Sequence, residues 1–139
     1  MVRYWLAKQE PDGPRGYSID ELKKDNTTVW DNVHNNLALK HMKQMKKGDS
    51  ILYYHTGKER QIVGIMSITS KPYSNPDEIN PRFIVVDVKY KQKFKNPVTL
   101  HEIKNIGGEF TKWELLRISR LSVMPVSENI WNKILKLSK

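Results

Sequence analysis

The sequence predicts an α+β fold in which five or six short strands, with small helices between them, form a sheet curled toward a barrel. Runs of alternating or β-branched residues indicate the strands, most clearly at 50–56, 61–69 and 83–95. Polar capping residues before short amphipathic segments indicate the helices. Because the chain has 139 residues and shows no repeat or linker, we expect residues 1–139 to form a single domain.

In the first half of the chain, strands and helices alternate. We expect strands at residues 4–8, 28–30, 50–56 and 61–69, and helices at residues 18–26 and 36–46. Ser18 followed three residues later by Glu21 has the pattern of a capping box. Ala38, Met42 and Met45 recur at helical spacing, so they should face the core. The short polar segment 57–60 indicates a hairpin turn between the third and fourth strands.

The second half of the chain begins with a loop rich in Pro, Asn and Ser at residues 71–82. An apolar strand is expected over 83–88, continuing to 95, and a further strand over 121–124. Thr99 is expected to cap a short helix that ends at two glycines, and Ser127 a final amphipathic helix. The pattern over residues 110–117 does not decide between helix and strand.

The composition favours a polyanionic partner. Lysine and arginine number 24 against 15 acidic residues, which gives a formal net charge of +9. Such a charge attracts nucleic acid over long range, although it also serves solubility. The chain has no cysteine, which excludes disulfides and suits a cytoplasmic location. No apolar run approaches the roughly 18 residues of a membrane span, and the N-terminal residues are too polar for a secretory signal, so no membrane partner is expected.

Catalytic motifs are missing from the sequence. The four histidines, at positions 34, 41, 55 and 101, include no pair at the i, i+4 spacing of a helical metal site. There is no Gly-rich phosphate loop, no Gly-x-Ser-x-Gly turn and no cysteine nucleophile. We therefore expect no enzyme, no metal and no cofactor. A small-molecule pocket or a hydrolytic enzyme stays open as an alternative, because active-site residues need not be close in sequence.

Two lysine clusters are candidates for contacts with a phosphate backbone. The first cluster is Lys89, Lys91, Lys93 and Lys95, and the second is Lys40, Lys43, Lys46 and Lys47. Because side chains alternate along a strand, the first cluster should lie on one face and match a row of phosphates. Lysines on an edge strand also prevent aggregation, and lysines on a helix often cover a solvated face. From these clusters we take Lys40, Lys43, Lys89, Lys91 and Lys93 as candidate backbone contacts.

Trp30 precedes a stretch rich in asparagine. An indole can stack on a nucleobase, and amide side chains can hydrogen-bond to the edge of the base. Such stacking contributes roughly 1–3 kcal/mol per base. The alternative is a partly buried core tryptophan, with Asn35 or Asn36 capping the helix that follows.

Five segments together resemble the EVE domain, a member of the PUA-like superfamily related to YTH domains. They are Trp5-Leu6-Ala7-Lys8-Gln9-Glu10-Pro11, Tyr17-Ser18-Ile19-Asp20-Glu21-Leu22, Trp30-Asp31-Asn32-Val33-His34-Asn35, the stretch from Lys47-Gly48-Asp49 to Tyr53-Tyr54-His55-Thr56, and Ile62-Val63-Gly64-Ile65. The third resembles the family's Trp-Asp-Gly-Val-Arg-Asn, with Asn32 in place of Gly and His34 in place of Arg. Position 34 therefore carries a histidine, which can be neutral at pH 7, where the family pattern has a fixed positive charge.

The resemblance implies a PUA-like mixed β pseudo-barrel of five to six strands with flanking short helices. It also implies a pocket for a flipped base, with modified cytosine in DNA linked to EVE domains and methylated adenine in RNA to YTH domains. By similarity, Trp30 is a wall of the pocket and Tyr73 a second aromatic wall. The other pocket residues implied are Lys8, Gln9, Glu10, Asn32, Val33, Asn35, Asn36, Tyr53, Tyr54 and His55.

The sequence thus favours a non-enzymatic reader of a methylated base, with DNA or RNA as partner. An RNA-binding accessory module for tRNA or rRNA processing, without selectivity for modified bases, is the alternative. The sequence does not distinguish DNA from RNA, does not show which of Tyr53 and Tyr54 faces the pocket, and leaves the oligomeric state open.

Overall fold

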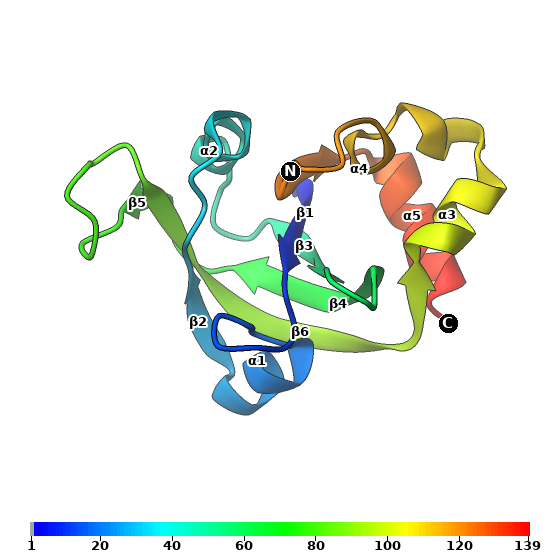
Figure 1. The fold of residues 1–139 in the computed structure, drawn as a ribbon, viewed down its shortest axis with the longest axis horizontal. Coiled ribbons are helices and arrows are strands. Elements are labelled where there is room, and N and C mark those ends of the chain that lie inside the picture. Colours follow the sequence, from blue (N-terminus) through cyan, green and yellow to red (C-terminus); the bar gives the residue numbers. More distant parts are fainter. Residues whose placement is uncertain (1) are drawn as a thin grey trace.

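The computed structural model describes residues 2–139 and has the predicted α+β architecture (Figure 1). The strands are β1 (Tyr4–Gln9), β2 (Thr27–Trp30), β3 (Ser50–His55), β4 (Gln61–Ile68), β5 (Tyr73–Ser74), β6 (Ile84–Thr99) and β7 (Val123–Val126). Within the described residues the sheet has the order β2-β6-β4-β3-β1-β7, and the short β5 pairs with β6. Because β1 and β3 are parallel while the other pairs are antiparallel, the sheet is mixed as expected.

Short helices flank this sheet. They are α1 (Ile19–Asp25), α2 (Asn36–Lys43), α3 (Leu100–Ile106), α4 (Glu114–Arg117) and α5 (Glu128–Leu137), with a 3-10 helix, η1 (Gly108–Lys112), between α3 and α4. Ser18 and Glu21 form the predicted capping box at α1, and Thr99 and Ser127 cap α3 and α5. The undecided segment 110–117 is helical. α2 ends at Lys43, three residues before the predicted end at residue 46. The chain turns tightly at Gln44, whose amide donates to the carbonyl of His41.

The curl of the sheet is produced mainly by β6, whose 16 residues bend across the molecule toward α3 (Figure 1). The pairing of β6 with β4 shifts register between Ile65 and Met66, which pair with Gln92 and Tyr90 and leave Lys91 between them. This bulge interrupts the alternation of faces. It falls within the run of lysines predicted to share one face, Lys89, Lys91, Lys93 and Lys95, and all four of these side chains are exposed.

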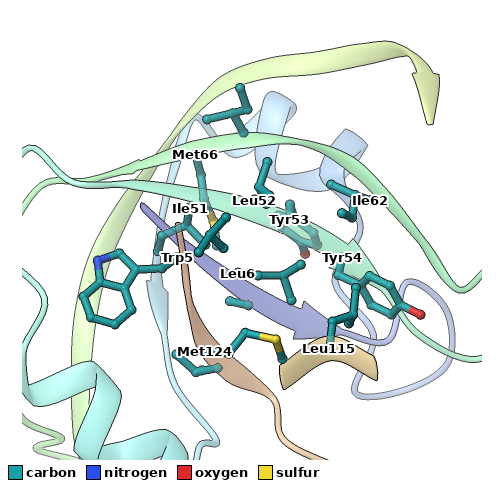
Figure 2. Close-up of a cluster of buried hydrophobic side chains, with 14 of the residues drawn as sticks. Trp5, Leu6, Ile51, Leu52, Tyr53, Tyr54, Ile62, Met66, Leu115 and Met124 are labelled. Carbon is teal, nitrogen blue, oxygen red and sulfur yellow. The ribbon is translucent and has the colours of Figure 1, made fainter. Parts of the chain in front are cut away.

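The core is one continuous cluster of buried side chains from the sheet and the flanking helices. Figure 2 shows part of it, with Trp5 and Leu6 on β1 packed among side chains of β3, β4, β7 and α4. Trp5 Nε1 donates to the buried carboxylate of Asp49 at 3.0 Å, and the same carboxylate accepts the backbone amides of Arg3 and Lys46. The groups that donate to Asp49 are thus all fixed by the fold, which offsets the cost of burying its carboxylate.

α2 lies across the open side of the curled sheet, where it contacts both β6 and β7. Ala38, Leu39 and Met42 are the buried residues of α2, so the predicted inward positions Ala38 and Met42 are confirmed. Met45, just beyond the helix, is also buried. The segment from Asp31 to Asn35, which joins β2 to α2, is consequently held at the rim of the sheet.

Candidate nucleic-acid interface

A cavity of about 620 Å³ opens beside the end of β1. Residues from β1, β3, α3, α4 and four loops line it, so it is built from segments distant in sequence. Its cationic residues are Lys8, Arg15, Arg60, Lys104 and Arg120. Glu10 is the carboxylate among its lining residues, and His34 stands at the same wall. Five fixed cations against one carboxylate make this cavity, called here the basic cavity, a site for a polyanion.

Lys8 holds a half-buried position in the basic cavity. Its Nζ donates to the carbonyl of Ser119 at 2.9 Å and lies 5.5 Å from the ring centroid of Tyr54. Burial lowers the pKa of Lys8 from its ordinary value, because desolvation disfavours the ammonium form. These contacts fix the ammonium group at the cavity wall instead of leaving it free in solvent.

A smaller cavity, of about 240 Å³, adjoins the basic cavity. Gln9, Arg15 and Asn32 line both. The smaller one, called here the aromatic cavity, is otherwise lined by Pro14, Gly16, Tyr17, Thr28, Val29, Trp30 and Asp31. Gln9 Nε2 donates to the carbonyl of Arg15 at 2.8 Å and so ties the loop after β1 to the strand. The two cavities therefore share a wall of amide and guanidinium groups.

Trp30 combines the two roles that the sequence left open. It lines the aromatic cavity, yet it is only 6% exposed and belongs to the core. Its ring meets the edge of Tyr53 at 5.2 Å between centroids and 88° between planes. This T-shaped pair and the surrounding core hold the indole in place beside the cavity.

Of the two neighbouring tyrosines, Tyr54 faces the basic cavity and Tyr53 points into the core (Figure 2). The hydroxyl of Tyr53 donates to the carbonyl of Tyr17, and burial raises the pKa of Tyr53. Tyr17 in turn donates to Asp25 at 2.7 Å, and burial together with that bond raises its pKa to about 12. Tyr53 thus supports the aromatic cavity from behind without lining it.

His55 also lies outside both cavities. It is buried, and its Nε2 accepts the backbone amide of Ile19 at 3.1 Å. The proton of the neutral ring is therefore on Nδ1, which donates to Glu59 Oε1 at 2.9 Å. The hydrogen bond from His55 is the main cause that lowers the pKa of Glu59. His55 anchors the start of α1 to β3, so the structure gives it a supporting position.

The segment after Trp30 is shaped by its asparagines. Asn32 has a φ of 60°, a left-handed conformation that Asn tolerates better than other residues with a side chain, which accounts for Asn where the family pattern has Gly. Val33 is buried. Asn35 caps α2 by accepting the amide of Ala38 at 3.0 Å, as the alternative interpretation of this segment anticipated. Of these residues, Asn32 lines both cavities.

His34 links this segment to the loop between β5 and β6. Its Nε2 lies 3.0 Å from Glu78 Oε1, and its ring meets that of Phe83 at 4.5 Å between centroids. Tyr73, in contrast, lines neither cavity: its hydroxyl donates to Asp87 at 2.6 Å, a bond that with burial raises its pKa to about 12. The structure thus does not bring Tyr73 to the pocket as a second wall, and Tyr17 supplies the second aromatic side chain of the aromatic cavity instead.

The lysines chosen from the sequence lie away from both cavities. Lys40 and Lys43 line a separate hollow with Asn36 and Arg82, while Lys89 and Lys91 are exposed on β6. Lys93 is engaged by Asp20 at 2.7 Å. The cations that do gather in the basic cavity, apart from Lys8, were missed because each stands alone in its local sequence. Arg15 in a Gly-Pro loop and Arg120 just before the predicted strand over 121–124 carried no local signal.

Neither a cluster of metal-ligating side chains nor a helix able to span a membrane is found among residues 2–139. No group of three or more His, Asp or Glu side chains is placed to hold a metal ion in that part of the chain. No helix there is both long enough and apolar enough to cross a membrane.

The fold and the paired cavities define a small α+β domain with a basic cleft beside an aromatic slot. The chain belongs to the EVE domain family, whose model matches residues 3–137. It is 30% identical to human thymocyte nuclear protein 1 over 169 residues, an alignment that covers 100% of this chain and 75% of the relative.

Two solved structures superpose on nearly the whole chain. A crystal structure of human THYN1 in complex with DNA containing 5-methylcytosine has a TM-score of 0.91 at 28% identity, and the match covers 99% of this chain and 98% of that one. The solution structure of Rpa0253 from Rhodopseudomonas palustris has a TM-score of 0.89 at 34% identity, covering 99% and 93%. The resemblance to the EVE domain inferred from the sequence is thereby confirmed.

Proposed function

We propose that this protein is a DNA-binding module that reads a methylated base, with 5-methylcytosine as the first candidate. The observation that carries the proposal is the pair of adjoining cavities, one cationic and one aromatic, which share Gln9, Arg15 and Asn32. The DNA complex of the structural relative human THYN1 supports the choice of DNA and of 5-methylcytosine.

The basic cavity is suited to hold backbone phosphates. Each phosphate that a lysine or arginine neutralises releases counterions, so affinity should fall as salt rises. Contacts of this kind fix the register of the nucleic acid without reading its sequence. The cavity therefore supplies affinity that is indifferent to methylation.

The aromatic cavity is suited to hold the base. Trp30 and Tyr17 offer aromatic edges, and Val29 and Thr28 offer apolar surface for a methyl group. Asp31 and the shared amides can accept or donate hydrogen bonds at the edge of the base. One methyl group in a fitted pocket is worth about 1–3 kcal/mol, so discrimination should be roughly 10–200-fold.

A base can enter the aromatic cavity only if it leaves the stack of neighbouring bases in the nucleic acid. Flipping costs a few kcal/mol, so single strands and mismatched sites should bind more readily than a perfect duplex. Binding and release complete the proposed role, and no chemical step on the base is part of it.

The proposal is tested by fluorescence anisotropy with matched short DNA and RNA oligonucleotides, each unmodified or carrying 5-methylcytosine or N6-methyladenine. We expect 5-methylcytosine in DNA to tighten binding by about tenfold or more. If affinity depends on salt but not on any modification, the protein is instead a general nucleic-acid binder, and stronger binding to RNA would favour the accessory role in tRNA or rRNA processing.

A variant that fills the aromatic cavity tests whether this cavity is the place where the methylated base binds. Val29 is 44% exposed and lines the aromatic cavity, so Val29→Trp should occupy that space without disturbing the core. The matched control is Ile106→Trp, at another exposed apolar residue, which lines neither cavity. We expect Val29→Trp to abolish the preference for the methylated base while Ile106→Trp retains it. Equal preference in the two variants would contradict the assignment of the slot.

A further inference from the structure

A third hollow, of about 290 Å³, lies where α2 meets the loop between β5 and β6. Its lining residues are Asn36, Leu39, Lys40, Lys43 and Arg82. None of them lines the basic cavity or the aromatic cavity. The hollow is thus a separate place on the surface, called here the α2 hollow.

The three cations of the α2 hollow converge from two elements. Lys40 and Lys43 are three residues apart on α2, so they are neighbours on one side of the helix. Arg82 comes from the loop and is held toward α2, because its Nη1 donates to Asn36 Oδ1 at 2.5 Å. Its guanidinium also lies 4.7 Å from the ring centroid of Phe83. An arginine fixed in this way loses little conformational entropy on binding an anion.

No carboxylate balances these charges. Among the ion pairs within 4.0 Å that residues 2–139 form, none involves Lys40, Lys43 or Arg82. Lys93 and Lys133, by comparison, are paired with Asp20 and Glu109. Three uncompensated cations around a concave surface match the charge and the several acceptor oxygens of a phosphate.

The position of the α2 hollow relates it to the basic cavity. His34 lines the basic cavity, and Asn36 lines the hollow two residues later on the same segment. Two residues span at most about 7 Å of chain. The loop that carries Arg82 is also tied to the cavity wall by the contact between Glu78 and His34. The α2 hollow and the wall of the basic cavity are therefore carried by the same two segments of the chain, close enough for one polymer of phosphates to contact both.

The same loop favours a large partner over a small ion. Ile79, three residues before Arg82, is fully exposed, although its loop is braced by side-chain bonds of Asn75 and Asn80 to backbone amides. An ordered loop that presents an apolar side chain beside cations suits the surface of a nucleic acid, where wedge residues of this type contact base steps.

We propose that the α2 hollow binds a backbone phosphate of the nucleic acid whose modified base enters the aromatic cavity. The polymer is taken from the proposed function, whereas the phosphate chemistry rests on the hollow itself. The protein then binds its ligand both at the α2 hollow and at the adjoining basic and aromatic cavities. Oligonucleotides too short to reach both places should bind more weakly than longer ones.

The test compares two double variants that remove the same charge. Lys40→Ala/Lys43→Ala empties the hollow of its lysines, and Lys133→Ala/Lys136→Ala removes a pair at the same spacing on α5. The logarithm of the association constant is measured against the logarithm of salt concentration by anisotropy, with methylated and unmodified DNA. We expect the first variant to reduce the slope by about 0.9 for each phosphate that is no longer neutralised, and the second to leave it nearly unchanged. The ratio between methylated and unmodified DNA should be the same in both variants.

Equal slopes for the two double variants would overturn the proposal, since only net charge would then matter. A free-phosphate site is distinguished by titrating inorganic phosphate while following the amide signals of α2. If phosphate saturates the hollow and the DNA slope is unaltered by Lys40→Ala/Lys43→Ala, the site is for a small anion and the proposal fails. If methylated and unmodified DNA bind equally well but Lys40→Ala/Lys43→Ala still reduces the salt slope, phosphate binding in the α2 hollow is supported and the proposed reading of a methylated base is contradicted.

Because Lys40 and Lys43 occupy the last turn of α2, they also offset the negative end of the helix dipole. Melting temperatures of both variants therefore accompany the titrations. A fall in slope with an unchanged melting temperature assigns the effect to binding. Lys40→Arg/Lys43→Arg, which keeps the charge, should restore the slope, and failure to restore it would contradict phosphate binding at these positions.

Discussion

The basic cavity and the aromatic cavity adjoin each other but are built in opposite ways. The basic cavity is lined by single cations contributed by a strand, a helix and separate loops, and most of its side chains contact solvent. The aromatic cavity is formed around Trp30, which the core holds in place through Tyr53. One region is thus suited to bind by charge, which tolerates movement and substitution, and the other by shape, which requires rigidity.

This difference teaches how affinity and selectivity can be separated in one small domain. Charge interactions should change affinity for every ligand equally, whereas changes in the slot should alter only the preference among bases. Four variants, taken from the largest expected effect to the smallest, test where affinity and selectivity can be changed separately and where they cannot.

Trp30→Ala should destabilise the whole fold, so its effects on affinity and on selectivity cannot be separated. Trp30 is almost wholly buried, and truncating a buried Trp costs about 3–5 kcal/mol. We expect the free energy of unfolding in urea to fall by that amount, so weaker DNA binding in this variant would report unfolding as well as damage to the slot. A decrease below about 1 kcal/mol would mean that Trp30 is not the support the structure indicates.

Asp31→Asn should change which base is preferred. Asp31 lines the aromatic cavity, and a carboxylate can accept a hydrogen bond from the exocyclic amino group of cytosine. We expect discrimination between cytosine and thymine at the target position to change by about 1–3 kcal/mol, measured by competition between two labelled oligonucleotides. Unchanged discrimination between cytosine and thymine would mean that Asp31 does not contact the edge of the base. Glu10 would then be the next carboxylate to substitute.

Arg60→Ala/Arg120→Ala should lower affinity without changing preference. Both arginines line the basic cavity and neither lines the aromatic one. The slope of affinity against salt should decrease by about 0.9 for each phosphate that the variant no longer neutralises, with an equal decrease for methylated and unmodified DNA. Lys89→Ala/Lys91→Ala, on the exposed part of β6, is the matched control. An effect confined to methylated DNA would show that the two cavities are not independent.

Glu59→Gln should have the smallest effect, and one that depends on pH. The pKa of Glu59 is lowered in the folded protein by the hydrogen bond from His55, so its carboxylate contributes stability above the unfolded value of 4.5 and loses it as pH falls through the lower, folded value. Because Glu59 is partly exposed, we expect a difference in melting temperature of up to a few °C near pH 7, shrinking at acidic pH. A constant difference across pH would contradict this assignment.

The sequence predicted the fold well because its signals are local. Capping residues such as Ser18 and Ser127 and the alternating strands around the 57–60 turn each specify an element from a few neighbouring residues. The bulge at Lys91 was not predictable in this way, because it arises from the pairing of β6 with β4. There Gly64 lets the strands approach so closely that an added Cβ would lie 2.3 Å from the carbonyl oxygen of Gln92.

The site was predicted only in part, for the same physical reason. The resemblance to the EVE family named Lys8, Gln9, Glu10, Asn32 and Tyr54, all of which line a cavity. Runs of lysine drew attention to β6, but charge that is contiguous in sequence need not face a ligand. The arginines of the basic cavity come from three loops far apart along the chain, and only the three-dimensional structure brings them together.

The most direct test of the central claim is the ratio of affinities for 5-methylcytosine DNA and unmodified DNA, measured at several salt concentrations on the same wild-type sample. If charge supplies affinity and shape supplies selectivity, both affinities should fall steeply with salt while their ratio stays constant, at about tenfold or more. A ratio of one, or a ratio that collapses together with affinity as salt rises, would contradict the division between the two cavities.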